Sequence, residues 1–272
     1  MKSYVLITGA TGGLGKALAA ECASRGWNLF LTDLSGQSLE ILATGLDRLY
    51  SVELLHHPCD LTDAASREAL WQVIKQSGLR FHMLLNVAGV DFEGPFRERE
   101  ITELRTILQV NIESVVEMTR RVLLFRDPTR TLRIVNVSSL AGYYPMPLKA
   151  IYAASKRFLI DFSLALNQEL RSSDVTVMAL CPAGMPTNQE TKRGIQAQGF
   201  LGKITTLNVG TVSARTINLA LAGRKVYIPG AFNQTLQLLG SLAPPDAVAS
   251  LINQRWKAAR RKSIPTPADS SP

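Results

Sequence analysis

The segment TGATGGLG, at residues 8–15, decides the fold of this 272-residue chain. It follows the apolar run YVLIT at residues 4–8, and a helical pattern starts directly after it. In such a unit the glycines let a pyrophosphate approach the backbone, and the N–H groups at the helix N-terminus stabilise its charge. Because the turn opens the first strand–helix unit, we interpret it as a dinucleotide-binding turn. The alternative is a tight turn without a ligand.

Two glycine spacings fit this turn. Gly9, Gly13 and Gly15 give TGxxxGxG, whereas Gly9, Gly12 and Gly15 give TGxxGxxG. Both spacings occur in turns that hold a dinucleotide, and the turn alone does not decide between them.

An acidic residue follows the glycine turn at the spacing that is usual for a residue that binds ribose. Asp33 stands eighteen residues past Gly15, at the end of the second predicted strand. An acid about 20 residues downstream commonly accepts hydrogen bonds from the adenosine ribose hydroxyls. The competing interpretation is a helix N-cap or a turn residue, which Asp also favours.

Short apolar runs alternate with helical patterns along the chain. The predicted strands are residues 4–8, 28–32, 52–57, 82–87, 132–137, 175–180 and 225–228. The predicted helices are at about residues 14–25, 36–48, 63–77, 101–124, 151–171 and 210–222. Strands separated by helices imply right-handed crossovers and a covered parallel sheet. The pattern predicts an α/β fold, a single Rossmann-like domain doubly wound around about seven parallel strands.

The chain after residue 230 has a different character. We expect residues 1–230 to form the dinucleotide-binding catalytic domain and residues 231–272 to form an appendix. Its apolar residues recur at helical spacing, and a basic segment and a Ser/Pro-rich end that we expect to be disordered follow. The apolar positions are Phe232, Leu236, Leu239 and Leu242. An amphipathic basic helix can lie in an anionic lipid interface, so peripheral membrane contact is one hypothesis; packing on the domain or on a partner subunit is the other.

Composition narrows the class of protein. The chain is 46% hydrophobic and 19% charged, which suits a globular protein with a sizeable core. Three scattered cysteines favour reduced core thiols, and no spacing of metal ligands occurs, so we predict no metal site. We interpret His56, His57 and His82 as structural.

The net charge and the hydropathy of the chain indicate which partners and which cellular location to expect. The net charge is +8, and much of the excess lies between Arg255 and Lys262. No basic groove with interleaved aromatic residues is evident, so we predict no nucleic-acid function. Because no apolar leader precedes the first strand and no apolar run could span a membrane, we expect a cytoplasmic protein.

The segment IYAASK, at residues 151–156, suggests chemistry. Tyr152 and Lys156 are four residues apart, so on a helix they share one face. In a cleft, the ammonium would lower the pKa of the phenol and make it a general acid or base near neutral pH. A surface pair is the alternative.

Taken in order, seven motifs resemble those of the short-chain dehydrogenase/reductase family over residues 3–230. They are TGATGGLG, CDLTD (59–63), NVAG (86–89), Asn111, IVNVSS (134–139), YAASK and CPAGMPT (181–187). The chain length and NVAG favour the non-extended branch and hence TGxxxGxG. Val87 and Ala183 depart from the family's usual Asn and Gly.

The resemblance implies catalytic roles. Tyr152 would exchange the proton with the substrate oxygen, Lys156 would lower its pKa and bind the nicotinamide ribose, and Ser139 would polarise the carbonyl. Asn111 would hold a water that relays protons to the lysine. Ser138 is expected to satisfy backbone groups.

The resemblance also implies a cofactor site and a reaction. The residues implied in cofactor binding are Gly9, Thr11, Gly13, Leu14, Gly15, Asp33, Asp60, Leu61, Asn86, Ala88, Gly89, Tyr152, Lys156, Pro182 and Thr187. We expect hydride transfer between a nicotinamide and a secondary alcohol or ketone. NAD is the expected cofactor, because Asp33 repels a 2′-phosphate and no cation stands beside it, while NADP remains an alternative. Lys16 could weaken that preference.

Substrate and partners are less constrained by the sequence. Phe92, Tyr143, Tyr144 and Met146 suggest an apolar pocket, suited to a 3-oxoacyl or steroid-like compound, under a lid at residues 188–209. The family usually forms dimers or tetramers, so a homo-oligomer is expected. Two rival hypotheses are a catalytically silent Rossmann-fold binding protein and a membrane-surface protein acting through its appendix.

Overall fold

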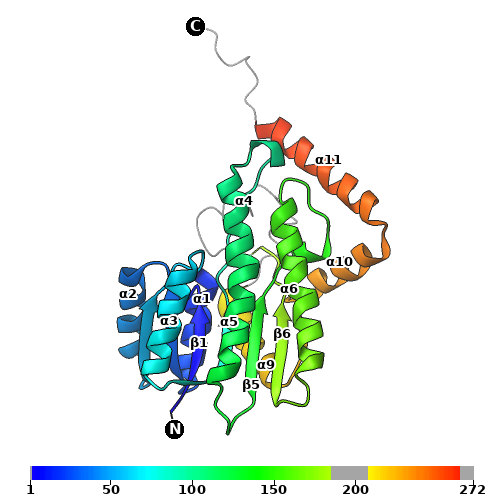
Figure 1. The fold of residues 1–272 in the computed structure, drawn as a ribbon. Coiled ribbons are helices and arrows are strands. Elements are labelled where there is room, and N and C mark those ends of the chain that lie inside the picture. The colour runs from blue at the N-terminus through cyan, green and yellow to red at the C-terminus, as the bar shows by residue number, and fades with distance from the viewer. Residues whose placement is uncertain (1, 185–207, 264–272) are drawn as a thin grey trace.

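The computed structural model describes residues 2–184 and 208–263, and its centre is a parallel sheet (Figure 1). Seven strands lie in the order β3-β2-β1-β4-β5-β6-β7. Their bounds are β1 Ser3–Thr8, β2 Asn28–Asp33, β3 Leu54–Pro58, β4 Arg80–Asn86, β5 Leu132–Val137, β6 Val175–Leu180 and β7 Val226–Tyr227. The predicted fold class is confirmed, with strand limits that differ by at most two residues.

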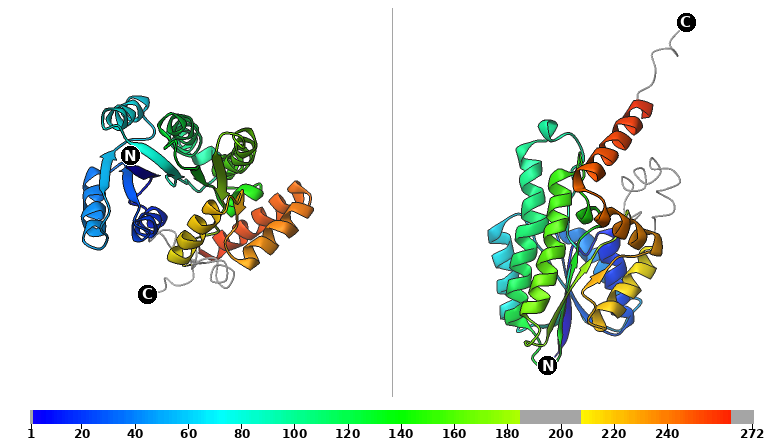
Figure 2. Two further views of the ribbon diagram at one scale, coloured as in Figure 1. Left: turned by 90° about the horizontal axis from the view of Figure 1, so that it is seen from below. Right: turned by 90° about the vertical axis from the view of Figure 1, so that its right-hand side faces the viewer.

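Helices cover both faces of the sheet (Figure 2). The α-helices that follow the strands are α1 Gly13–Ser24, α2 Gly36–Asp47, α3 Ala64–Gln76, α4 Ile101–Leu108, α5 Ser114–Val122, α6 Ala150–Glu169 and α9 Val209–Leu221. Helices α1, α2 and α9 pack in one core, whereas α3, α5 and α6 pack in the other.

The alternation of side chains along β1 explains why one sheet supports two cores. Val5 and Ile7 are fully buried under α1, while Tyr4 and Leu6 are buried on the opposite face. Successive residues of a strand point to opposite faces, so a doubly covered strand is apolar at every position. This is why YVLIT reads as a continuous apolar run.

The strand order reverses beside β1. Strand β1 pairs with β2 on one side and with β4 on the other. The chain leaves β1 toward one edge of the sheet and returns to build the other half from β4. Such a switch point, at the carboxyl ends of the strands, is where open α/β sheets bind ligands. Thr8, Asp33, Asn86 and Val137 end their strands at this edge.

One predicted helix, at residues 101–124, is wrong in its continuity. Between α4 and α5 the chain widens into the π-helical segment η2 Gln109–Glu113, and α5 then ends in the short 3-10 turn η3 Leu123–Phe125. Asn111 lies in the π-helical segment, and its amide accepts from Val90 N and donates to Val90 O at 2.9 and 3.0 Å. Periodicity of apolar residues does not reveal such an inserted residue.

The appendix is helical through residue 263. Helix α10 Ala231–Leu242 packs on the 3-10 turn η4 Leu140–Tyr143 and is followed by α11 Pro245–Ser263, which extends away from the domain (Figure 1). The end that we predicted to be disordered lies largely outside the described residues. Among the described helices none is both long and apolar enough to cross a bilayer.

The cysteines are core thiols, as predicted, and two of the histidines contact other side chains of the domain. Cys22, Cys59 and Cys181 are free and buried. His82 is buried with its Nδ1 3.1 Å from Ser3 Oγ, and burial lowers the pKa of its imidazole to about 4, so it is neutral at pH 7. His56 lies 2.9 Å from Glu40 at the surface of β3. No cluster that could hold a metal occurs within the described ranges.

Candidate active site

The turn after β1 needs glycine at two positions. Gly9 has a φ of +64°, and a Cβ there would lie 2.7 Å from the backbone of Ala88. A Cβ at Gly15 would lie 2.1 Å from Gly9 O. A Cβ at Gly12 would meet that oxygen at 3.4 Å, an ordinary contact. Packing therefore requires the outer glycines and leaves the spacing of the middle one open.

The N-terminus of α1 suits an anion. No side chain caps this helix, which begins at Gly13, whereas Ser35, Asp63 and Asn208 cap α2, α3 and α9. The first N–H groups of a helix are left without intrahelical partners, and its dipole favours negative charge there. A pyrophosphate would complete this end of the helix. Leu14, also predicted at the site, is buried in the core below.

Asp33 faces the glycine turn. Its Oδ2 accepts from the backbone N–H of Thr11 at 2.8 Å and from the Thr11 hydroxyl at 2.7 Å. Its Oδ1 accepts from Leu34 N at 2.7 Å. The N-cap of α2 is Ser35, so Asp33 is not the cap of that helix. The carboxylate thus lies where a ribose at the turn would meet it.

Asp60 and Leu61 lie next to this position. Cys59 N donates to Asp33 O at 2.8 Å, which brings the loop after β3 against the end of β2. Asp60 accepts from the backbone and hydroxyl of Thr62 at 2.8 and 2.7 Å. The carbonyl of Leu61 accepts from buried Arg67 at 2.7 Å, so the loop is held from below.

The NVAG segment closes the floor of the site. The amide of Asn86 donates to Asn136 Oδ1 at 2.8 Å, and Ala88 N donates to Thr8 Oγ1 at 3.3 Å. A Cβ at Gly89 would lie 3.0 Å from Lys156 Nζ and 3.3 Å from Asn111 Oδ1. Glycine therefore lets the segment approach the lysine closely.

Helix α6 places Tyr152 and Lys156 together, as the spacing predicted. Lys156 Nζ lies 5.6 Å from the centroid of the Tyr152 ring and donates to Val137 O at 3.0 Å. Burial lowers the pKa of Lys156 to about 8, against the opposing effect of Asp91. Burial also raises the pKa of Tyr152, and Asp91 adds to it, while a hydrogen bond with Ser139 and the charge of Lys149 act the other way.

The direction of that tyrosine shift corrects one expectation. We expected the neighbouring ammonium to lower the pKa of the phenol. In this structure burial and Asp91 outweigh Ser139 and the charge of Lys149, so the pKa of Tyr152 lies above its ordinary value. The neutral phenol, a proton donor, is therefore the form that the protein favours at neutral pH.

The two serines after β5 differ as predicted. Ser138 donates to Lys156 O at 2.6 Å and is buried, so its hydroxyl is occupied by the backbone of α6. Ser139 is half-buried, hydrogen bonds to Tyr152, and its Oγ accepts from Ala141 N at 3.1 Å. Pro182 lies beside it, since its carbonyl is 3.5 Å from Ser139 Oγ.

Asn111 connects three parts of the site. Besides its two bonds to Val90, its Nδ2 donates to Ser155 Oγ at 3.1 Å on α6. The side chain is fully buried. The amide therefore joins the loop after β4 to the helix that carries Tyr152, which is a structural role.

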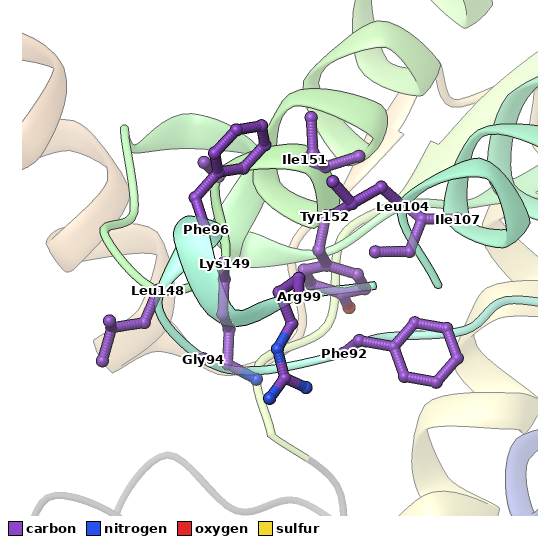
Figure 3. Close-up of a pocket in the computed structure, with 11 residues that line it drawn as sticks. Phe92, Gly94, Phe96, Arg99, Leu104, Ile107, Leu148, Lys149, Ile151 and Tyr152 are labelled. Atoms are coloured by element: carbon purple, nitrogen blue, oxygen red, sulfur yellow. The ribbon is translucent and has the colours of Figure 1, made fainter. Parts of the chain in front are cut away.

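Sequence reasoning missed a second cation beside Tyr152. Lys149 Nζ lies 5.7 Å from the ring centroid and forms ion pairs with Asp91 at 2.5 Å and Glu93 at 3.0 Å. Figure 3 shows Lys149 and Tyr152 with Phe92 around one small pocket. The spacing of Lys149, three residues before Tyr152, is helical and could have drawn attention to it.

The four residues of the predicted apolar pocket do not share one cavity. Phe92 lines a small pocket with Tyr152, of about 30 Å³. Tyr143, Tyr144 and Met146 instead line a larger apolar cavity of about 530 Å³ between the loop after η4, α6 and the start of α11. Helical geometry separates them, since the cavity is lined by another face of α6. Thr187 and nearly all of the predicted lid lie outside the described residues.

Known proteins resemble this chain in sequence and fold. A family model described as short chain dehydrogenase matches residues 3–197. A very-long-chain 3-oxoacyl-CoA reductase of Anas platyrhynchos is 34% identical over 66% of this chain and 59% of its own length. A 17-beta-hydroxysteroid dehydrogenase type 3 of Homo sapiens is 31% identical over 69% of this chain and 60% of its own length. A short-chain dehydrogenase from Sphingobium yanoikuyae in complex with NADPH superposes with a TM-score of 0.74, at 25% identity over 99% of this chain and 98% of that one.

The chain belongs to the short-chain dehydrogenase family. The family is one of dehydrogenases, which use NAD or NADP as cofactor. The chain spans less than two thirds of the length of the curated relatives it matches. The residues around the glycine turn fit such a cofactor, since the uncapped α1 and Asp33 offer partners for its pyrophosphate and ribose.

Proposed function

We propose that this protein interconverts a ketone and a secondary alcohol, with Tyr152 as the proton-transferring residue. The observation that carries the proposal is the position of the Tyr152 ring, which lies 5.6 Å from Lys156 Nζ and hydrogen bonds to Ser139. The nicotinamide cofactor supplies the hydride when bound. The protein contributes orientation, proton transfer and charge stabilisation.

Tyr152 is suited to donate a proton to a ketone oxygen. Because burial raises the pKa of its phenol, the group stays protonated at neutral pH. When the proton leaves, the ammonium of Lys156 stabilises the phenolate through its charge. Ser139 can donate its hydroxyl hydrogen to the same substrate oxygen as negative charge develops there.

Asn111 and Gly89 position the lysine rather than touch the substrate. Gly89 lets the loop after β4 lie against Lys156, and Asn111 fixes that loop through Val90. A lysine held between Val137 O and this loop keeps its ammonium near Tyr152. We also propose that a water held at Asn111 relays protons to Lys156.

We propose NAD(H) as the preferred cofactor. Asp33 offers a carboxylate to the ribose, and the flanking residues Thr11 and Leu34 carry no positive charge. A 2′-phosphate at this position would face a like charge. A solved relative is in complex with NADPH, and Lys16, which directly follows Gly15, is the basic residue of the turn that could contact a phosphate.

An apolar ketone is the proposed substrate class. Relatives named as 3-oxoacyl-CoA and 17-beta-hydroxysteroid enzymes support this choice. Phe92, Phe96, Leu104 and Ile107 line the small pocket of about 30 Å³ beside Tyr152 and provide apolar contacts there. A medium or long 3-oxoacyl thioester and a 17-ketosteroid are the compounds to compare first.

We propose further that the protein is a homo-oligomer. Phe158 and Phe162 stack on the outer side of α6, with ring centroids 5.6 Å apart, and Phe158 is exposed. Val116 on α5 and Leu164 on α6 are exposed as well. Light scattering of the purified protein tests this directly.

The deciding experiment is a turnover screen of ketones and alcohols with NAD(H) and NADP(H). Turnover that disappears in Tyr152→Phe supports the proposal. Binding of either cofactor by the wild type, without turnover of any compound in a broad panel, would favour the rival hypothesis of a silent Rossmann-fold binding protein.

A further inference from the structure

A long segment of this chain carries no charge. Residues 226–245 contain no Asp, Glu, Lys, Arg or His, although 19% of the whole chain is charged. The segment comprises β7, the turn that follows it and all of α10. An uncharged helix at the end of a chain with abundant charge calls for a physical explanation.

One face of α10 is fixed to the domain. Asn233 is buried and donates to Pro229 O at 2.8 Å. A Cβ at Gly240 would lie 2.2 Å from the ring of Tyr144, so the helix meets the loop after η4 in close contact. The helix is therefore held on the domain by this face.

The other face of α10 is apolar and exposed. Phe232, Leu238, Leu239 and Leu242 lie on it, and the last of these is 76% exposed. Leu251, on the following helix, is exposed as well. Single exposed apolar residues are common, but four on one uncharged helix form a patch of the kind that marks an interaction surface.

The next helix is strongly basic. Helix α11 holds Arg255, Lys257, Arg260, Arg261 and Lys262 against the single acid Asp246. Arg255 is exposed, and the helix runs beyond the domain at the end where the β-strands terminate (Figures 1 and 2). An apolar face followed directly by clustered positive charge is the composition of helices that lie in anionic lipid interfaces.

Charge distinguishes a lipid surface from a second copy of the chain. A contact with a second copy would bring together two chains that each carry a net charge of +8, with five basic residues on each α11. Like charges would then oppose association, whereas anionic headgroups would attract the same residues. The described domain does not cover this face either, because the leucines remain exposed.

We propose that α10 and α11 dock the protein on an anionic lipid surface. The face with Phe232, Leu239 and Leu242 enters the boundary between headgroups and acyl chains, and the basic residues of α11 lie among the headgroups. Docking through α10 and α11 would hold the edge of the sheet where the strands end near the bilayer.

Co-sedimentation with vesicles tests the proposal on the full chain. Vesicles of phosphatidylcholine with phosphatidylglycerol are compared with pure phosphatidylcholine, at low and high salt. We expect binding only to the anionic vesicles, with an affinity that falls at least about tenfold at high salt. Equal binding to both vesicle types, or none to the anionic vesicles at low salt, would overturn it.

Two variants address the two parts of the surface separately. Leu239→Ser with Leu242→Ser removes apolar area, and Arg260→Glu with Arg261→Glu reverses charge; each should weaken anionic binding about tenfold or more. Leu49→Ser is the matched control, because Leu49 is 72% exposed on the far side of the domain after α2. An unchanged melting temperature and unchanged turnover of a water-soluble ketone show that the fold persists.

The same variants also test the alternative that a second copy of the chain binds this surface. If they dissociate an oligomer in light scattering while vesicle binding stays at the wild-type level, the surface is a protein interface and the proposal is wrong. Should the leucine variant fail to fold, the charge variant still decides, since its substitutions lie in the helix that extends from the domain.

Discussion

Thr11 donates both its backbone N–H and its hydroxyl to a single carboxylate oxygen of Asp33, at 2.8 and 2.7 Å. The carboxylate is thereby oriented against the glycine turn before any cofactor binds. Preorganisation of this kind lowers the entropy that a ligand must lose on binding. Thr11, the residue of the turn that contacts Asp33, is neutral, whereas binding of a 2′-phosphate there would need a positively charged side chain.

Replacing Asp33 should change the choice of cofactor. In Asp33→Ala we expect the ratio of kcat/KM for NAD(H) to that for NADP(H) to fall by at least about tenfold, because the like charge and the ribose hydrogen bonds are both removed. Thr11→Val, which keeps the charge, should change the ratio much less. An unaltered ratio in Asp33→Ala would show that Asp33 is only a turn residue.

Removing the phenolic proton should abolish the reaction. We expect Tyr152→Phe to lose roughly a hundredfold or more in kcat, as is usual when a general acid is lost, while its dissociation constant for the cofactor changes little. The ring still packs, so the melting temperature serves as a control. Retention of more than a few per cent of the wild-type kcat would contradict the role assigned to Tyr152.

Lys156 should make stability depend on pH in an unusual direction. Burial lowers its pKa in the folded protein to about 8, from 10.5. The unfolded chain therefore holds the proton more tightly, and the cost of burying the charge is complete below pH 8 and fades as the pH rises toward 10.5. The free energy of unfolding of the wild type should therefore rise by about 2 kcal/mol relative to that of Lys156→Met between pH 7 and pH 10. Denaturant titrations at both pH values measure this difference.

Lys149 provides the contrast for that experiment. Burial lowers its pKa, but Asp91 and Glu93 together raise it above the ordinary value. Its ammonium then stabilises the fold below its unfolded pKa, and that stabilisation disappears only as the pH rises through the higher folded value. Lys149→Met should therefore cost stability by a constant amount between pH 7 and pH 9. Parallel curves for both lysine variants would refute the assigned environments.

The amide of Asn111 should matter for stability as well as for activity. Asn111→Ala leaves the N–H and C=O of Val90 without their partner in a partly buried place, at a cost of about 2 kcal/mol in the free energy of unfolding. Gln109→Ala, in the same π-helical segment, removes one weaker bond of 3.3 Å and should cost less than about 1 kcal/mol. Equal losses for the two variants would mean that the segment, and not this amide, is responsible.

The sequence predicts the regular part of the fold well, for a physical reason. Buried parallel strands such as β1 are apolar throughout, and the glycine turn marks the first crossover, so the element order follows directly. The pairing of Tyr152 with Lys156 was likewise predictable, because both lie on one helix. The choice of Ser139 over Ser138 agrees with their hydrogen bonds, since Ser138 is occupied by Lys156 O.

What escaped prediction depends on contacts between distant residues. The π-helical segment is associated with hydrogen bonds between Asn111 and Val90, 21 positions apart in sequence, which no periodicity shows. The ion pair of Lys149 with Asp91 joins two loops, 58 positions apart. The raised pKa of Tyr152 depends on how deeply α6 is buried. Spacing along a chain gives proximity on a helix but not the dielectric surroundings of a group.

The place of β1 in the sheet has a consequence for synthesis of the protein. Its two neighbours come from different stretches of the chain, since β2 follows at once but β4 ends only at residue 86. While the chain emerges from the ribosome, one edge of β1 therefore stays unpaired until about a third of the protein has been translated. An uncovered apolar edge invites pairing with other nascent chains. Among the described strands, the one that begins the cofactor turn thus waits longest for its second partner during translation.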